Sequence, residues 1–134
     1  PEVDLWSAGC ILAEMATSHP TFPGDSEIGT AFKIMQLLGS PTEASWPGFE
    51  KILAHWSPQF PRWPPGDLAP IRELRPELGE VGLDLIHALL VMNPAARLTA
   101  RRARAHAFLG REGAPATPPV ARRLLAGAGR PQTD

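Results

Sequence analysis

The sequence has little cysteine, no long apolar run and no excess of one charge sign, and each shortage excludes a class of protein. Its single cysteine, Cys10, cannot form an intrachain disulfide. The absence of about 18 consecutive apolar residues argues against a membrane span, and the start of the chain has no secretion-signal pattern. The formal net charge of −1 argues against a nucleic-acid-binding protein. We therefore expect an intracellular protein that contacts neither membrane nor nucleic acid.

Motifs that bind nucleotides or metals are also missing. Gly24, Gly39 and Gly48 are isolated turn glycines and do not form a phosphate-binding loop. The four histidines are scattered without the spacing of a metal site, so we expect no metal. Cys10 lies in an apolar helical pattern without a basic neighbour, which predicts inert packing. The sequence thus predicts no catalytic residue in this chain.

Apolar periodicity predicts an all-α fold. It indicates helices near 4–17, 25–38, 83–92 and 99–106, and a short helix that begins at 40–43. Asp25 is the expected N-cap of the second helix, and Gly39 its end. Residues 46–76 are rich in proline but contain three Trp and two Phe, which predicts an irregular, ordered loop on a helical body. No segment has the alternation of a β-strand.

Charge divides the chain into two parts. Residues up to Ala96 contain twelve acids and five bases, whereas the remainder contains eight Arg and two acids. The composition of residues 110–134, which is rich in Gly, Ala, Pro and Arg, predicts a disordered basic tail. Apolar residues cover most of the circumference of the first helix, which predicts a helix buried on nearly all sides within a larger protein.

Two charged residues are candidates for buried polar contacts. Asp4 directly precedes the apolar run of the first helix, so we expect it to be partly desolvated. It either caps its own helix or binds the backbone amides of another segment. Arg97 is an isolated cation between two helices, and it either caps carbonyl groups or forms a buried ion pair.

Five segments follow one another in the order and at the spacing of one known family: Asp4-Leu-Trp-Ser-Ala-Gly-Cys10, Pro20-Thr-Phe-Pro-Gly-Asp-Ser-Glu-Ile28, Leu38-Gly-Ser-Pro-Thr-Glu43, Pro58-Gln-Phe-Pro-Arg-Trp63 and Asn93-Pro-Ala-Ala-Arg-Leu98. They resemble the C-lobe of a eukaryotic protein kinase from the F helix onward, and specifically the cyclin-dependent kinases of the CMGC group. The resemblance implies a partial kinase domain over residues 1–109, with helices F to I and the CMGC insert at about 40–76.

The resemblance implies supporting roles and no catalytic ones. In the family, the acid that matches Asp4 accepts hydrogen bonds from the backbone of the His-Arg-Asp catalytic loop. Arg97 matches the arginine that pairs with the glutamate of the Ala-Pro-Glu motif, and Trp6 lies with them as a support. The intact parent would use ATP and Mg to phosphorylate Ser or Thr before Pro in the nucleus or cytoplasm. This chain alone lacks the ATP-binding and catalytic motifs, so we expect it to hold no cofactor and to be inactive.

The resemblance also implies protein partners besides substrates. The start of the G helix and the insert would bind a small Cks-type regulatory subunit through Asp25, Glu27, Ile28, Phe32, Pro58, Phe60 and Trp63. Gly29, Thr30 and Ala31 replace the family's usual Asp, Gln and Leu, which makes this surface smaller and less charged. In the tail, Arg122 and Leu124 form an Arg-x-Leu motif that resembles those that dock on cyclins; a plain solvated tail is the alternative.

Two functions remain open from the sequence. The first is the C-lobe portion of a cyclin-dependent serine/threonine kinase, and the second is an inactive, kinase-derived binding module for Cks-like or cyclin partners. An upstream sequence with a Gly-rich loop and His-Arg-Asp would favour the first, and a start codon near Pro1 would favour the second. A third reading is another branch of the same kinase group, such as the mitogen-activated kinases, which share the Asn-Pro-x-x-Arg form but not the Gly-Asp-Ser-Glu-Ile stretch.

Overall fold

The computed structural model describes residues 2–53 and 60–110, and these residues form helices joined by turns and loops. Their order is α1 (Glu2–Thr17), α2 (Glu27–Leu38), α3 (Phe49–Leu53), α4 (Ala69–Leu74), the 3-10 helix η1 (Pro76–Leu78), α5 (Gly79–Leu89) and α6 (Ala100–Arg104). No strand occurs within the described residues, which confirms the all-α prediction. The basic tail that the sequence predicts lies outside them.

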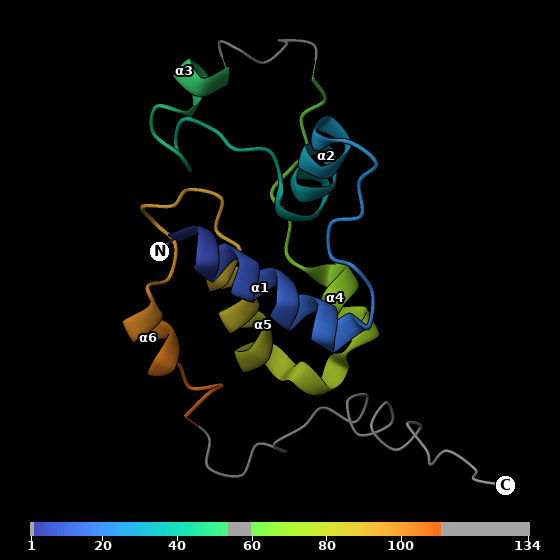
Figure 1. Ribbon diagram of the computed structural model, residues 1–134, viewed down its shortest axis with the longest axis vertical. Coiled ribbons are helices and arrows are strands. Elements are labelled where there is room, and N and C mark those ends of the chain that lie inside the picture. Colours follow the sequence, from blue (N-terminus) through green and yellow to red (C-terminus); the bar gives the residue numbers. More distant parts are fainter. Residues whose placement is uncertain (1, 54–59, 111–134) are drawn as a thin grey trace, which may run out of the picture.

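Helix α1 lies across α5, and α4 packs against both near the C-terminal end of α1 (Figure 1). Helices α2 and α3 lie apart from each other on the same side of this group, and α6 lies on another side. The core joins α1, α4 and α5 through six buried apolar side chains: Ala13, Leu68, Ile71, Leu83, Ile86 and Leu90. Burial of these side chains supplies the main free energy that holds the helices together.

A glycine permits the close crossing of α1 and α5. A Cβ atom on Gly9 would lie 2.9 Å from Leu89 Cβ and 2.9 Å from Leu90 Cδ2, which is closer than carbon atoms pack. The absence of a side chain therefore lets the two helices approach each other here.

The middle of the long insert is tied to Ser40, just after the end of α2. The hydroxyl of Ser40 accepts a hydrogen bond from the backbone N–H of Trp63 at 2.9 Å, and the N–H of Ser40 donates to the carbonyl of Trp63 at 3.0 Å. Gly39 ends α2 with φ +86°, a left-handed value that glycine adopts without strain. These contacts hold residues 60–63 against α2, as the sequence predicts for an ordered insert.

Four local predictions differ from the structure. The N-cap of α2 is Ser26 and not Asp25, because the Ser26 hydroxyl accepts the N–H of Gly29 at 3.0 Å. Residues 40–43 form no helix; instead the carboxylate of Glu43 accepts the N–H of Gly48 at 2.5 Å, just before α3 begins. The insert is also more regular than expected, because it contains α3 and α4. The predicted helix at 99–106 exists but ends at Arg104.

Candidate functional site

Arg97 lies at a junction between the start of α1 and the loop that follows α5. Its Nε donates to the carbonyl of Val91 at 2.8 Å and its Nη2 to the carbonyl of Met92 at 3.1 Å. Its Nη1 donates to the carbonyl of Glu2 at 2.5 Å, which links residues far apart in the sequence. We call Arg97, these three carbonyls and Trp6 the Arg97 junction. Of the two sequence alternatives for Arg97, the structure shows carbonyl capping.

The ring of Trp6 packs against the guanidinium of Arg97. The Cζ atom of Arg97 lies 5.1 Å from the centroid of the Trp6 ring, which is the geometry of a cation–π contact. The ring of Phe22 stacks on Trp6 with centroids 5.8 Å apart and an interplanar angle of 16°. Trp6 therefore couples the position of Arg97 to the apolar core, on which Trp6 itself packs.

Burial sets the acid–base behaviour at this end of α1. Burial lowers the pKa of Arg97, and the charges of Glu2 and Cys10 act in the opposite direction. Arginine nonetheless keeps its charge at any physiological pH. Burial, followed by the charge of Glu14, raises the pKa of the Cys10 thiol. The thiol therefore stays protonated at neutral pH, which fits the predicted inert packing role.

Asp4 does not occupy the environment that the sequence predicted. It is exposed, and it lies in the first turn of α1, which begins at Glu2, so it is not the N-cap residue. Its carboxylate still lies where the helix dipole favours a negative charge. The expectation of partial desolvation is wrong for the described residues because no described segment covers this side of α1.

The outer side of α1 is apolar and exposed. Val3, Ile11 and Met15 retain 73%, 57% and 49% of their accessible surface. The sequence predicts burial of this helix on nearly all sides within a larger protein; among the described residues, this side of α1 is uncovered. Spacings of eight and four residues place these three side chains on one side of the helix, on which Ser7 is also exposed.

An apolar hollow adjoins the Arg97 junction. It has a volume of about 310 Å³, and its lining includes Trp6, Ile34, Met35, Trp46, Phe49 and Arg97. The rings of Trp46 and Phe49 stack with centroids 5.0 Å apart, which fixes one wall. The hollow thus combines an apolar lining with one cation at its edge.

The structure brings together part of the predicted partner surface. Phe32 lies 5.2 Å from Phe60 in an edge-to-face contact and 5.5 Å from Trp63, so these rings form one cluster between α2 and the insert. Asp25, Glu27 and Ile28 are exposed, and Ile28 retains 54% of its surface.

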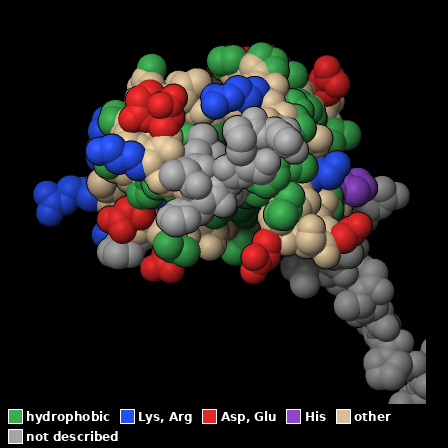
Figure 2. Space-filling view, turned by 90° about the horizontal axis from the view of Figure 1, so that it is seen from above, with side chains coloured by type: hydrophobic (Ala, Val, Ile, Leu, Met, Phe, Trp, Pro, Cys, Tyr) green, Lys and Arg blue, Asp and Glu red, His purple; other side chains and the backbone are tan. Residues whose placement is uncertain are grey.

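The remaining predicted partner residues, Pro58, Arg122 and Leu124, lie outside the described residues. Viewed from the α2 and α3 end, apolar side chains lie between separate acidic and basic ones (Figure 2). This face therefore carries no field of a single charge sign, in agreement with the near-neutral net charge.

The protein kinase domain family matches residues 1–109 of the chain. The chain belongs to the protein kinase domain family. The all-α arrangement of its described residues agrees with the helical C-lobe of such a domain, which the sequence predicted. The family match by itself does not distinguish the cyclin-dependent kinases from other kinases.

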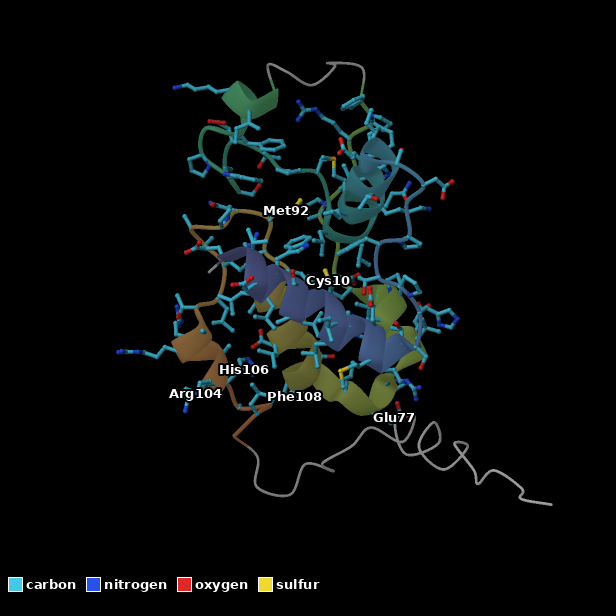
Figure 3. All side chains as sticks on the ribbon, viewed as in Figure 1. Cys10, Glu77, Met92, Arg104, His106 and Phe108 are labelled. Carbon is cyan, nitrogen blue, oxygen red and sulfur yellow. The ribbon has the colours of Figure 1, made fainter. Side chains whose placement is uncertain are left out.

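Sequence reasoning missed one polar contact in this kinase domain. The ring Nε2 of His106 lies 2.9 Å from Asp84 Oδ2, and Figure 3 shows His106 between α6 and α5. Phe108 packs close to α5, because a Cβ atom on Gly82 would lie 3.0 Å from its ring. The 22-residue separation of the acid and the histidine carries no periodic signal, so only the tertiary structure reveals this anchor of α6.

Two kinds of feature are absent from the described residues. They contain no group of three or more His, Cys, Asp or Glu side chains placed to hold a metal ion. Within the same part of the chain, the helices are too short or too polar to cross a membrane.

Proposed function

We propose that the chain is the C-lobe portion of a cyclin-dependent serine/threonine kinase. The complete catalytic domain would bind ATP and Mg, act with a cyclin in the nucleus or cytoplasm, and phosphorylate Ser or Thr before Pro. The family match supports kinase ancestry, and the Gly-Asp-Ser-Glu-Ile and Pro-x-Phe-Pro-x-Trp segments support the subtype. The role of this chain would be structural, because it would position catalytic groups that another segment contributes.

The Arg97 junction is the observation that carries the proposal. A guanidinium has five N–H donors, and three hydrogen bonds to carbonyls account for three of them. The remaining donors can bind a carboxylate, such as the glutamate of an Ala-Pro-Glu segment, with little reorganisation because the side chain is already fixed. The adjoining apolar hollow of about 310 Å³ offers space for the apolar residues of the same segment.

The exposed side of α1 supports the same proposal. Val3, Ile11 and Met15 form an apolar surface beside the exposed carboxylate of Asp4. A segment that packs on this surface would bury apolar area and bring backbone N–H groups to Asp4. We propose that the catalytic loop of the intact kinase is this segment, with Asp4 as the acceptor of its amides.

The test begins with the transcript upstream of Pro1. We expect it to encode, in frame, a Gly-rich loop, a lysine, His-Arg-Asp and Asp-Phe-Gly. The encoded protein, purified with a cyclin, should phosphorylate a Ser-Pro peptide and leave the matched Ser-Ala peptide unmodified. The 134-residue chain serves as the control and should transfer no phosphate. An upstream sequence without these motifs, or an encoded protein that prefers Ser-Ala, would contradict the proposal.

A second candidate function is that of a binding module for Cks-like or cyclin partners. The observation that favours it is the fixed cluster of Phe32, Phe60 and Trp63, beside which Ile28 is exposed. Calorimetry of the chain with a Cks-type subunit tests it. An Ile28→Asp variant should lose binding, whereas Ile52→Asp, at a similarly exposed position, should not. Absence of binding by the unchanged chain would remove this candidate.

A further inference from the structure

Helix α6 presents three arginines on one exposed turn. Its sequence from Ala100 to Arg104 places Arg101, Arg102 and Arg104 on a helix without any acid, and all three side chains are exposed. The ion pairs found within residues 2–53 and 60–110 join other groups, so none of these arginines has an acidic partner there. Figure 3 shows Arg104 at the outer edge of α6.

Two of these arginines border one open depression. Arg101 and Arg104 line it together with Ala100 and Ala105, and its volume is about 510 Å³. Residues three apart on a helix are neighbours, so the two guanidinium groups can act on one ligand. The small side chains of the flanking Ala100 and Ala105 leave room for a ligand chain to approach the helix.

Contacts at both ends fix this turn. The Thr99 hydroxyl accepts the N–H of Arg102 at 3.4 Å and caps the start of α6. Beyond the end of α6, His106 contacts Asp84 at 2.9 Å and so attaches the turn to α5. The same contact engages the carboxylate of Asp84 on α5. The arginines therefore project from a fixed platform, which lowers the entropic cost of binding.

We propose that the Arg101–Arg104 face of α6 is a docking surface for an acidic, carboxylate-rich segment of a partner protein. Arginine forms paired, charge-assisted hydrogen bonds with carboxylates, and no acid of the described residues competes for these three. The surface is independent of the Arg97 junction and of the kinase subtype.

The distribution of charge along the chain favours a peptide over a nucleic acid. Residues up to Ala96 carry twelve acids and five bases, so an extended polyanion that reached beyond α6 would meet a negative body. Residues 100–104 also lack Phe, Tyr and Trp, on which the bases of a single strand would stack. The basic surface spans little more than one helical turn, which suits a short acidic segment.

Fluorescence anisotropy with the full 134-residue chain tests this docking surface. The probe is a labelled peptide of alternating glutamate and serine, and its matched reference carries glutamine for glutamate. We expect the double variant Arg101→Gln/Arg104→Gln to weaken binding by about tenfold, because two charged hydrogen-bonded contacts are lost. The control Lys33→Gln/Lys51→Gln removes the same charge at exposed positions on α2 and α3 and should weaken binding by less than about twofold.

Three outcomes would overturn the docking surface. The first is equal weakening by the control variant, which would show attraction by net charge alone. The second is equal binding of the glutamine peptide, and the third is a single-stranded RNA that displaces the glutamate peptide through the same arginines. Circular dichroism of Arg101→Gln/Arg104→Gln should show unchanged helix content because both side chains are exposed.

Discussion

Replacement of Arg97 by methionine should destabilise the fold measurably. The variant keeps much of the apolar stem but loses three hydrogen bonds to carbonyls and the contact with the Trp6 ring. The two bonds to Val91 and Met92 are partly buried and contribute about 1 kcal/mol each, whereas the exposed bond to Glu2 contributes little. The cation–π contact adds about 0.5–1 kcal/mol. We expect a loss of roughly 2.5 kcal/mol in the free energy of unfolding.

Urea denaturation followed by tryptophan fluorescence measures this loss. With a denaturant slope of about 1.5 kcal/mol/M, the midpoint should fall by roughly 1.7 M. Arg97→Lys should lose about half as much, because an ammonium cannot bind three carbonyls in the same geometry. The exposed Arg62 gives a matched control, and Arg62→Met should stay within about 0.5 kcal/mol of the unchanged chain. An Arg97→Met variant as stable as this control would refute the importance of the junction.

Three other perturbations have defined outcomes. Because burial raises the pKa of Cys10 above its ordinary 9.0, the unfolded thiol ionises first as pH rises. The contribution of Cys10 to the free energy of unfolding should therefore be constant below the pKa of the thiol in the unfolded chain, and it should fall as pH rises toward the higher pKa in the folded chain. Cys10→Ala should abolish this fall in urea titrations at different pH values. Gly39→Ala should cost about 2 kcal/mol and Gly48→Ala only about 1 kcal/mol, since both have positive φ but only at Gly39 would a Cβ atom meet other atoms, at 2.7 Å; equal melting temperatures would contradict this. A double-mutant cycle of Phe32→Ala and Trp63→Ala should give a coupling energy of about 1 kcal/mol, and additive losses would show that the rings do not interact.

The helices could be predicted because their signals are local. Apolar spacing fixed the presence of α1, α2 and α5, and Thr99 identified the start of α6. The cap of α2 was misplaced by one residue because Asp25 and Ser26 are both good N-caps, and only backbone geometry distinguishes them. Ser26 has φ −152° and ψ 166°, the extended conformation that an N-cap requires.

The sites could be predicted only in part because their contacts join distant residues. The sequence identified Arg97 as a cation in need of partners, but the carbonyl of Glu2 lies 95 residues away along the chain. For α1, the apolar pattern indicates which side chains would be buried by a neighbouring segment, but it does not show whether this chain contains such a segment. Val3, Ile11 and Met15 therefore look buried in the sequence and are exposed in the structure.

The crossing of α1 and α5 at Gly9 also affects how the chain can fold and vary. These two helices enclose a loop of roughly 60 residues, so their contact forms only after a long closure, and we expect folding to be limited by this step. Closure entropy depends only on the logarithm of loop length, and a doubling of the loop costs only about 0.6 kcal/mol. The contact between α1 and α5 thus tolerates large changes in the length of the chain between the two helices. A single methyl group at Gly9 would nevertheless disturb it.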